Sequence, residues 1–329
     1  MKKIGVNGFG RIGRYSTRVA LMRDDVEVAL VNDITSAETL AHLFKYDSVH
    51  RQLPLEFRVD GNDLVFENGK RISIVSHHDP ADIPWSDYGV EYVLESTGIF
   101  RTEASASAHL KGGAKKVVIS APAKGGNVKT IVLGLNDELL DPSDVVLSNA
   151  SCTTNSAAPL LSVMCEMCTI ENVFLTTIHS YTSDQRLHDA PHMDLRRARA
   201  AAESIIPTTT GAADALVKIF PHLKGKIGGS AVRVPVANGS LTDVTLIVDK
   251  APGEDAIKQA MLEASQGRLK SILGYTNDPI VSVDIIGNSH SSIFDASLTR
   301  VQGNMIKIVG WYDNEAGYSN RLVDLIMKL

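Results

Sequence analysis

The chain opens with the stretch that decides its fold, Lys3-Ile4-Gly5-Val6-Asn7-Gly8-Phe9-Gly10-Arg11-Ile12-Gly13. Its first five residues are typical of a buried strand, and helical spacing continues over 14–22. A G-x-G-x-x-G motif between a strand and a helix permits a tight turn and the close approach of a pyrophosphate. We therefore predict a dinucleotide-binding βαβ unit, in which the cofactor contacts Gly8, Gly10, Arg11, Ile12 and Gly13.

The second strand of this unit is predicted over 26–32 and is followed by Asp33. A carboxylate at this position accepts hydrogen bonds from the adenosine ribose and would repel a 2′-phosphate. The next residues, Ile34, Thr35 and Ser36, bring no positive charge that could bind such a phosphate. The sequence therefore predicts NAD as the preferred cofactor, with some NADP activity tolerated.

Strands and helices alternate up to about residue 150. Helices are predicted over 36–45 and 103–112, and strands over 90–95, 115–120, 130–134 and 145–147. The turn signals Asp60-Gly61 and Asn68-Gly69 indicate antiparallel hairpins between them. Because the carboxyl ends of parallel strands line the ligand crevice, we also assign Thr97, Gly98 and Ser120 to the cofactor wall.

The second half of the chain has a different pattern. Strands are predicted over 173–179, 230–236, 241–248, 281–286 and 305–311, with one clear helix over 254–265 and a closing helix over 318–327. Long strands with few helices favour an antiparallel sheet that has its helices on one side. We therefore expect an α/β chain: a doubly wound Rossmann-type domain over 1–150, then an α+β domain with a largely antiparallel sheet over 151–314.

Cys152 stands where the strand over 145–147 gives way to a helix that runs from Thr154 to about Met167. The free N–H groups and positive dipole end of a helix favour a thiolate. A lone cysteine is more often a small packing residue, but the polar neighbours in 148–155 argue against an apolar pocket. His179 ends the next predicted strand. If the two strands are neighbours, this histidine reaches the thiol and serves as general base; otherwise it is an ordinary strand-end histidine.

These parts predict a particular chemistry. A thiolate adds to an aldehyde, hydride leaves for a nicotinamide, and an acceptor releases the resulting thioester; a phosphate acceptor would require a second anion pocket. Arg233 lies alone in an apolar strand and needs an anionic partner, which a structural carboxylate would also satisfy. The segment 208–213 can open a helix toward an anion, although a plain N-cap is the alternative.

The motifs resemble those of phosphorylating glyceraldehyde-3-phosphate dehydrogenases along the whole chain. The matching segments are Ser148–Asn155, His179-Ser180-Tyr181-Thr182, Arg196–Ala201, Thr210-Gly211-Ala212-Ala213 and Trp311-Tyr312-Asp313-Asn314-Glu315. The resemblance implies that Cys152 is the nucleophile and His179 the base. It implies a substrate-phosphate site of Thr182, Asp184 and Arg233, and an attacking-phosphate site of Ser151, Thr153, Thr210, Gly211 and again Arg233. On the cofactor side, it implies that Asn314 holds the nicotinamide carboxamide and that His78 approaches the adenine.

The same resemblance implies oxidative phosphorylation of D-glyceraldehyde 3-phosphate to 1,3-bisphosphoglycerate, an EC class 1.2.1 reaction of glycolysis or gluconeogenesis, with inorganic phosphate as second substrate. It also implies a homotetramer whose interface is crossed by a loop over about 180–203, and a C-terminal helix, about 315–329, that packs back on the first domain. Several residues depart from the family pattern. Ala316 stands where tryptophan is usual, Ser156 replaces a frequent second cysteine, Arg51 occupies a usual glycine position, and His78 lies where an arginine often approaches the adenine. Ala190 with Pro191 mixes features associated with different nicotinamide preferences.

Composition excludes several other classes of function. The net charge of −5 gives no reason to expect nucleic acid or a membrane surface as a partner. Three cysteines do not form a secreted disulfide framework, and Cys165 and Cys168 are interpreted as packing residues of a helix rather than as a redox or metal motif. With no signal peptide, no long apolar run and no metal site, a cytoplasmic protein is expected.

Three alternative functions stay open. The same fold could act on another phosphorylated aldehyde, such as erythrose 4-phosphate. A phosphate-independent aldehyde dehydrogenase would pass the acyl group to water instead. A non-catalytic binding protein could retain the fold without the reaction, although an intact set of Cys152, His179 and Arg233 argues against it.

Overall fold

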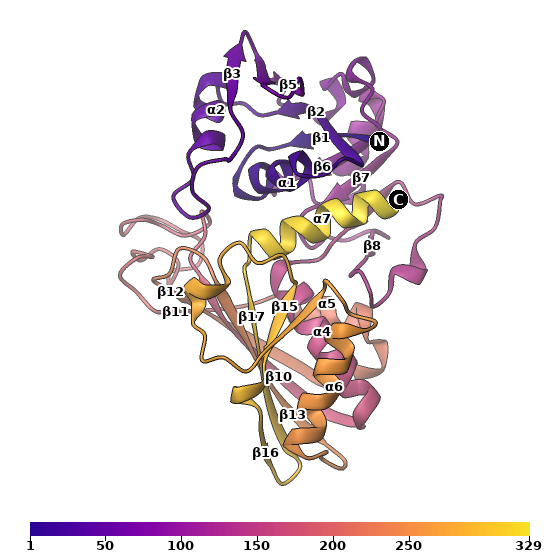
Figure 1. The fold of residues 1–329 in the computed structure, drawn as a ribbon, viewed down its shortest axis with the longest axis vertical. Coiled ribbons are helices and arrows are strands. Elements are labelled where there is room, and N and C mark those ends of the chain that lie inside the picture. Colours follow the sequence, from indigo (N-terminus) through magenta and orange to yellow (C-terminus); the bar gives the residue numbers. More distant parts are fainter. The chain divides into compact units, whose positions relative to one another are not determined.

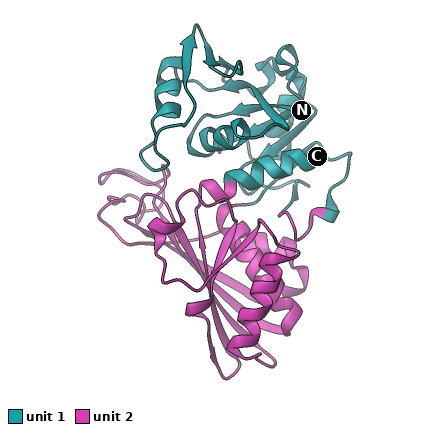
Figure 2. Cartoon of the chain, in the orientation of Figure 1, with its two compact units in different colours: residues 1–131, 138–150, 319–329 teal, residues 132–137, 151–318 magenta.

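The computed structural model describes residues 1–329, which form two compact units (Figures 1 and 2). Unit 1 contains Met1–Ile131, Glu138–Ala150 and Ser319–Leu329, and unit 2 contains Val132–Asp137 and Ser151–Tyr318. The chain therefore passes from unit 1 to unit 2 between Ala150 and Ser151, one residue before the cysteine singled out in the sequence.

Unit 1 is built on nine short strands and the helices between them. The strands are β1 (Lys2–Asn7), β2 (Val26–Asn32), β3 (Phe57–Asp60), β4 (Asp63–Phe66), β5 (Arg71–Val75), β6 (Tyr92–Glu95), β7 (Lys116–Ile119), β8 (Lys129–Thr130) and β9 (Val146–Ser148). The helices are α1 (Arg11–Leu21), α2 (Ala37–Lys45) and α3 (Glu103–Ala106), with 3-10 helices η1 (Pro80–Asp82), η2 (Trp85–Tyr88) and η3 (Ser107–Gly112). Two further helices include residues of both units: η4 (Asp137–Leu139) and α7 (Ala316–Lys328).

The sheet of unit 1 has the strand order β3-β4-β5-β2-β1-β6-β7-β9-β8. All pairs from β5 to β8 are parallel, whereas β3, β4 and β5 form antiparallel hairpins at one edge, as the two turn signals predicted. The doubly wound α/β prediction is thereby confirmed. In such a sheet the carboxyl ends of β1, β2, β6 and β7 lie along one edge, where α/β proteins bind ligands.

The last helix, α7, supplies part of unit 1. Lys2 Nζ donates to the carbonyl oxygens of Ile326 and Met327, each at 3.1 Å, and Arg23 pairs with Asp324 at 2.6 Å. Four apolar side chains of α7 are fully buried: Leu322, Val323, Leu325 and Ile326. Burial of this kind is the main source of helix stability in a folded protein.

Unit 2 has longer strands and three main helices. The strands are β10 (Ile170–Ser180), β11 (Ile206–Thr208), β12 (Ile227–Val234), β13 (Ser240–Val248), β14 (Leu273–Thr276), β15 (Ser292–Asp295), β16 (Arg300–Gln302) and β17 (Met305–Tyr312). The helices are α4 (Cys152–Met167), α5 (Ala212–Ile219) and α6 (Glu254–Gln266), with 3-10 helices η5 (Pro221–Leu223), η6 (Ser282–Ile285) and η7 (Ala296–Leu298).

The sheet of unit 2 has the order β11-β12-β10-β13-β17-β15-β14, and β16 pairs with β17. Only the pairs β10–β12 and β14–β15 are parallel, so the predicted, largely antiparallel sheet is confirmed. Helices α4, α5 and α6 lie on one face of this sheet (Figure 1). Burial alternates along β13 from Ser240 to Val248, as expected for a sheet with one face covered.

Three predicted elements were wrong in detail. The strand expected over 281–286 is the 3-10 helix η6, with Val281 and Val283 exposed. The helix expected over 103–112 is interrupted after α3 and continues as η3. The strand expected over 130–134 ends at Thr130, because Gly134 takes a positive φ of 79° in the turn that follows. None of the helices combines the length and apolar composition that spanning a bilayer requires.

Candidate active site

Cys152 is the first residue of α4. Ser151 is the N-cap, and its hydroxyl accepts a hydrogen bond from the Thr154 amide at 3.1 Å. The preceding residue, Ala150, has a left-handed φ of 56°, which is strained for a residue with a Cβ atom. A sharp turn thus leads directly into the helix, and Cys152 remains partly accessible at its N-terminal end.

The Cys152 thiol faces His179. The distance from Cys152 Sγ to His179 Nε2 is 3.5 Å, and His179 is 5% exposed. On the other side of the ring, Nδ1 lies 2.7 Å from the Ser180 carbonyl oxygen, which can only accept. Arg233 Nη1, which can only donate, also lies 2.5 Å from Nδ1. In the tautomer that has its proton on Nδ1, Nε2 is free to accept a proton from the thiol.

The Cys152 thiol and His179 are brought together by a helix and a sheet, not by two neighbouring strands. The sequence brought the two side chains together only on the condition that β9 and β10 are neighbours, but β9 belongs to the sheet of unit 1 and β10 to that of unit 2. Instead, α4 begins at the thiol and lies over the sheet that contains His179 near the end of β10. Helix-on-sheet packing within unit 2 therefore sets the distance between the two side chains.

Arg233 lies beside the histidine on the next strand. Parallel pairing of β10 with β12 sets His179 opposite Arg233. Arg233 Nη1 donates to the Ser180 carbonyl oxygen at 2.9 Å and lies 2.5 Å from His179 Nδ1, whereas its buried Nε has no hydrogen-bond partner. A guanidinium with an unused buried donor suits an anionic ligand.

Burial and the arginine set the charge state of the pair. Burial and, to a smaller extent, the nearby Arg233 guanidinium together lower the pKa of His179 to about 3, so the free imidazole is neutral. Burial also raises the pKa of the Cys152 thiol, while Arg233 and hydrogen bonds at the helix start act in the opposite direction. The helix effect predicted from the sequence is therefore present, but it works against desolvation.

Tyr312, at the end of β17, links the two sides of this site. Its hydroxyl lies 3.0 Å from Thr153 Oγ1 and 2.8 Å from Thr177 Oγ1, and burial raises its pKa. The edge of its ring meets His179, with a centroid separation of 5.9 Å. The sequence motif that contains Tyr312 was noted, but its role in fixing α4 against β10 was not, because a hydroxyl bridge between distant segments leaves no local pattern.

The predicted phosphate ligands lie in two loops of unit 2. Gly211 is the exposed N-cap of α5 with open space around it, and the Thr210 hydroxyl accepts from the Ala212 amide at 3.2 Å. Thr182 is half-buried, and its amide donates to Gln185. These groups offer backbone donors and hydroxyls of the kind that bind anions.

Asp184 does not offer a donor to a phosphate. Its exposed carboxylate accepts from Arg197 Nη1 at 2.5 Å, and Arg197 Nε donates to Thr208 Oγ1 at 3.0 Å. Arg197 is also close enough to Arg233 to lower the pKa of that residue. Arg197 is thus a second cation of this region, which the basic run 196–199 indicated without singling it out.

Asn314 is buried in the segment after β17. Its Oδ1 accepts from the hydroxyls of Ser180 and Ser240, both at 2.8 Å. These two bonds fix the amide so that Nδ2 remains a donor, which suits a carbonyl oxygen such as that of a carboxamide.

In unit 1, the glycine loop has the geometry of a pyrophosphate cradle. Gly8 has a φ of 89°, and a Cβ atom on Gly13 would lie 2.1 Å from the Gly8 carbonyl oxygen, so neither position admits a side chain. At Gly10, the N-cap of α1, a Cβ atom would meet only open space, and no side chain caps the helix. The loop therefore leaves room for an anion at the helix N-terminus, as NAD requires.

Other predicted cofactor residues surround this loop. Asp33 Oδ2 accepts from the Phe9 amide at 2.7 Å, which places the carboxylate next to the glycine loop. Arg11, at the start of α1 beside Ile12, pairs with Asp47 at 2.6 Å. The remaining residues are half-buried or exposed at strand ends or in the segment after β5: His78, Thr97, Gly98 and Ser120.

Comparison with known proteins agrees with both units. A family model described as "Glyceraldehyde 3-phosphate dehydrogenase, NAD binding domain" matches residues 2–103, and one described as "Glyceraldehyde 3-phosphate dehydrogenase, C-terminal domain" matches residues 151–314. Glyceraldehyde-3-phosphate dehydrogenase 1 of Bacillus cereus is 53% identical over 327 residues, covering 99% of this chain and 97% of that protein. The chain belongs to the glyceraldehyde-3-phosphate dehydrogenase family.

Other members of the glyceraldehyde-3-phosphate dehydrogenase family match over similar lengths. The enzyme of Geobacillus stearothermophilus is 53% identical over 325 residues, covering 98% of this chain and 96% of that protein. The enzyme of Thermotoga maritima is 51% identical over 332 residues, covering 100% of this chain and 99% of that protein. The resemblance predicted from the motifs is confirmed at the level of the family.

Two of the positions that depart from the usual family pattern, Ser156 and Ala316, are buried in this structure. The buried Ser156 hydroxyl lies 3.0 Å from Thr242 Oγ1 and 3.4 Å from the Ser292 hydroxyl. A serine here satisfies polar neighbours, and Cys152, Cys165 and Cys168 are all free thiols. Ala316, at the start of α7, is fully buried.

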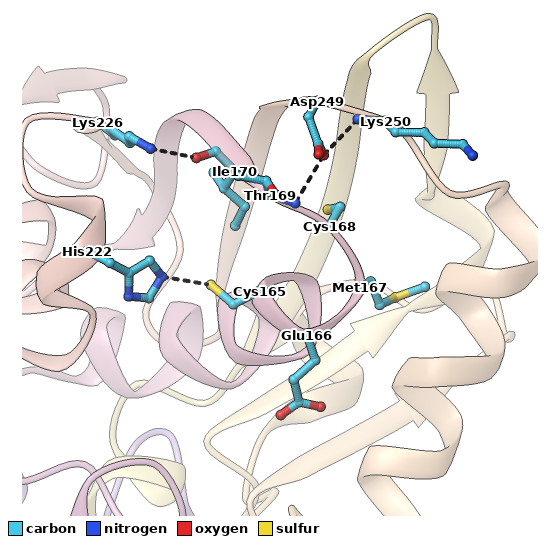
Figure 3. Close-up of a pocket in the computed structure, with 10 residues that line it drawn as sticks. All are labelled: Cys165, Glu166, Met167, Cys168, Thr169, Ile170, His222, Lys226, Asp249 and Lys250. Atoms are coloured by element: carbon cyan, nitrogen blue, oxygen red, sulfur yellow. Dashed lines mark hydrogen bonds between the residues drawn. The ribbon is translucent and has the colours of Figure 1, made fainter.

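One pocket of this glyceraldehyde-3-phosphate dehydrogenase family member lies away from the Cys152 thiol. It has a volume of about 690 Å³ and surrounds the end of α4, where Cys165 and Cys168 lie (Figure 3). Cys165 Sγ is 3.7 Å from His222 Nε2, and burial raises the pKa of Cys165 to about 11. The residues that line this pocket include neither His179 nor Arg233, which lie beside the Cys152 thiol.

Proposed function

We propose that the chain catalyses the oxidative phosphorylation of D-glyceraldehyde 3-phosphate to 1,3-bisphosphoglycerate with NAD. One observation carries the proposal: a thiol at a helix N-terminus lies 3.5 Å from a neutral histidine, beside an arginine with an unused buried donor. The names and the 51–53% identity of the relatives over nearly the whole chain support this function over the alternatives.

The reaction follows from the groups at the site. Cys152 Sγ forms a bond to the aldehyde carbon as His179 Nε2 takes the thiol proton, which is then passed to the carbonyl oxygen to give a hemithioacetal. His179 next removes the hydroxyl proton while hydride leaves the same carbon, giving a thioester on Cys152. NAD, when bound, supplies the hydride acceptor. Inorganic phosphate attacks the thioester, the C–S bond breaks, and the thiolate returns with the acyl phosphate released.

Two anion subsites serve this sequence of steps. We assign the substrate phosphate to Thr182 and Arg233, with Asp184 holding Arg197 in place rather than touching the anion. We assign the attacking phosphate to Ser151, Thr153, Thr210 and Gly211, with Arg233 shared. Hydroxyls, backbone donors and one guanidinium are the groups that phosphate ligands require.

On the cofactor side, we assign the pyrophosphate to the glycine loop, the adenosine ribose to Asp33 and the carboxamide to Asn314 Nδ2. The Asp33 carboxylate, held by the Phe9 amide, would face a 2′-phosphate with like charge. NAD is therefore preferred, and NADP is used less efficiently.

The assembly we propose is a homotetramer in the cytoplasm. The loop that follows β10 exposes Leu187, Met193 and Leu195, each at least three-quarters exposed, with Ile205 71% exposed beside them. Phe174 on β10 is 53% exposed as well. Large apolar side chains that are exposed to this degree are typical of a surface that another subunit covers.

Steady-state kinetics test the function directly. With glyceraldehyde 3-phosphate as substrate, NADH formation should depend on inorganic phosphate, and NAD should give a higher kcat/KM than NADP. Equal rates without phosphate would favour the non-phosphorylating alternative, and a higher kcat/KM for erythrose 4-phosphate would favour the other phosphorylated substrate. A higher kcat/KM with NADP would contradict the role of Asp33.

A further inference from the structure

A buried carboxylate of unit 1 has no part in the chemistry described so far. Glu95 ends β6 and is 1% exposed. Its Oε2 accepts from Asn7 Nδ2 at 2.6 Å and faces His109 Nε2 at 3.0 Å. Its Oε1 accepts from Thr97 twice, from the amide at 2.9 Å and from the hydroxyl at 2.5 Å. We call Glu95, Asn7, His109 and Thr97 the Glu95 cluster.

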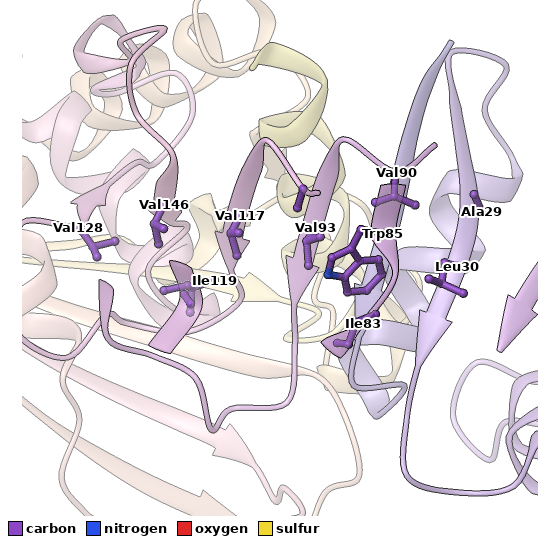
Figure 4. Close-up of a cluster of buried hydrophobic side chains, with 12 residues drawn as sticks. Ala29, Leu30, Ile83, Trp85, Val90, Val93, Val117, Ile119, Val128 and Val146 are labelled. Carbon is purple, nitrogen blue, oxygen red and sulfur yellow. The ribbon is translucent and has the colours of Figure 1, made fainter. Parts of the chain in front are cut away.

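The histidine side of the cluster has only one consistent arrangement of protons. Trp85 Nε1 lies 3.1 Å from His109 Nδ1, and an indole nitrogen can only donate. His109 Nδ1 is therefore the acceptor, so its proton sits on Nε2 and is donated to Glu95. Trp85 cannot turn away, because it is fully buried in the apolar cluster shown in Figure 4.

The asparagine side is fixed in the same way. The His77 amide, which can only donate, bonds Asn32 Oδ1 at 2.8 Å. Asn32 Nδ2 must then donate to Asn7 Oδ1, at 2.8 Å, and Asn7 Nδ2 must donate to Glu95. Donor-only groups thus close the network at both ends, and Glu95 accepts in all four of its own hydrogen bonds. A carboxylate is the side chain that accepts all of them.

The cluster ties together the strand ends that carry the predicted cofactor residues. Asn7 pairs with Glu95 across β1 and β6, and with Asn32 across β1 and β2. Gly8 follows Asn7 along the chain, and Asp33 follows Asn32. Thr97 is held by both its amide and its hydroxyl, immediately before Gly98 takes a positive φ of 73°.

We propose that Glu95 is a positioning residue for NAD binding, which it achieves by holding Thr97 and aligning the ends of β1, β2 and β6. The inference rests on the proposed function of unit 1 as the NAD-binding unit. Glu95 itself touches no cofactor, because it is buried beneath these residues. Its effect is preorganisation: groups already held in the binding geometry lose less freedom when the ligand binds.

The variant Glu95→Gln tests the proposal at constant volume. Next to Asn7 and His109, the new NH₂ group would face two donors and both bonds would be lost; next to Thr97, it would lose the bond from the backbone amide, whereas the hydroxyl can turn to accept. The matched control is Asp295→Asn in unit 2, which alters a carboxylate that is 2% exposed and accepts from Trp311 Nε1 at 3.0 Å and from the Ser297 hydroxyl at 2.6 Å.

Calorimetric titration with NAD and thermal unfolding without NAD should separate the two variants. Both should lower Tm, but only Glu95→Gln should weaken NAD binding, by roughly tenfold or more. With saturating NAD, its kcat and its KM for glyceraldehyde 3-phosphate should stay within about twofold of the parent. NAD affinity within twofold of the parent would overturn the inference, as would equal weakening by Asp295→Asn.

A second pair of variants covers the case in which Glu95→Gln does not fold. Thr97→Ser keeps the hydroxyl that bonds Glu95, whereas Thr97→Val removes it and keeps the shape. NAD should bind the serine variant as it binds the parent, and the valine variant severalfold more weakly; equal affinities would refute the role of the bond. Failure of the parent to bind NAD would instead refute the proposed function and the inference with it, whereas failure of the inference alone leaves parental activity intact.

Discussion

The two units each hold a buried polar cluster, and the clusters differ in whether the protein completes them. In unit 1, Glu95 receives four hydrogen bonds, and donor-only groups close the network at both ends. In unit 2, the cluster around His179 leaves the buried Nε of Arg233 without a partner. A fully hydrogen-bonded network makes the surrounding structure rigid. A buried donor without a partner can instead form its hydrogen bond with a ligand. We propose that the first cluster positions the residues that bind NAD, and that the second binds substrate and carries out the reaction.

The largest effect should come from removing the Cys152 thiol, which belongs to the cluster around His179. Cys152→Ser should lower kcat by roughly four to six powers of ten, because an alcohol at neutral pH cannot replace a thiolate nucleophile. Calorimetry should show unchanged NAD binding, since the glycine loop and the Glu95 cluster belong to unit 1. Turnover near that of the parent would refute a covalent mechanism at this residue.

Removal of the base should have the next largest effect. His179→Asn should slow the reaction by roughly two to four powers of ten, the usual contribution of a general base. Alkylation of Cys152 by iodoacetamide near pH 7 should slow as well, because Nε2 no longer accepts the thiol proton. If the alkylation rate stayed the same, His179 would not activate the thiol.

Arg233→Ala tests whether the cluster around His179 binds an anion. Loss of the guanidinium should raise KM for both glyceraldehyde 3-phosphate and phosphate by roughly ten- to a hundredfold, as expected for lost charge-assisted hydrogen bonds. Inorganic phosphate should raise Tm of the parent but not of the variant. The control is Arg268→Ala, which removes a guanidinium of the same unit that pairs with Glu166. Equal loss of efficiency with unphosphorylated glyceraldehyde would make Arg233 structural.

The smallest expected effect is on stability, and it concerns the hydrogen-bonded carboxylate of Asp47 in unit 1. Burial raises the pKa of Asp47, but hydrogen bonds from the His50 amide and from Arg11 outweigh this and lower it to about 2, from 3.8. A carboxyl group whose pKa is lower in the folded state stabilises the fold above about pH 4 and loses this effect as the pH falls through 2. Asp47→Asn should reduce the unfolding free energy at pH 7 by about 1 kcal/mol, after allowance for solvent screening.

Chemical denaturation from pH 7 to 2 provides the measurement for Asp47. The difference between parent and Asp47→Asn should shrink below pH 4, whereas the exposed control Asp87→Asn should show no such trend. A difference that stays constant with pH would mean that the Asp47 carboxylate is not specifically stabilised.

The elements predicted most accurately were those whose pattern is local. The strand over 26–32 was predicted to the residue, and glycines with positive φ mark both hairpin turns of unit 1. The predicted strand over 281–286 failed because Val281 and Val283, although apolar, lie on the surface. The short strands β14 and β15 were missed, since each of their four-residue segments becomes a strand only through pairing with its neighbours.

The sequence indicated candidate residues for the site, but it did not indicate which strands and helices bring them together. A cysteine before a helix and a histidine at a strand end can be recognised from sequence, but the sheet to which each strand belongs cannot. The bridge through Tyr312 and the orientation of Asn314 by two serines depend on contacts between segments more than 70 residues apart. The Glu95 cluster was not foreseen for the same reason, because its members are scattered from residue 7 to residue 109.

The position of α7 has a consequence for biosynthesis. Unit 1 contains Met1–Ile131, yet most of its last helix, α7, is synthesised only after unit 2. The contacts of Lys2 with Ile326 and Met327 span more than 320 residues, so they cannot form during synthesis. Contacts at such separation fold late. Unit 2 is nearly continuous over 151–318, and we therefore expect its core to be complete on the ribosome while the nascent amino-terminal unit still lacks its closing helix.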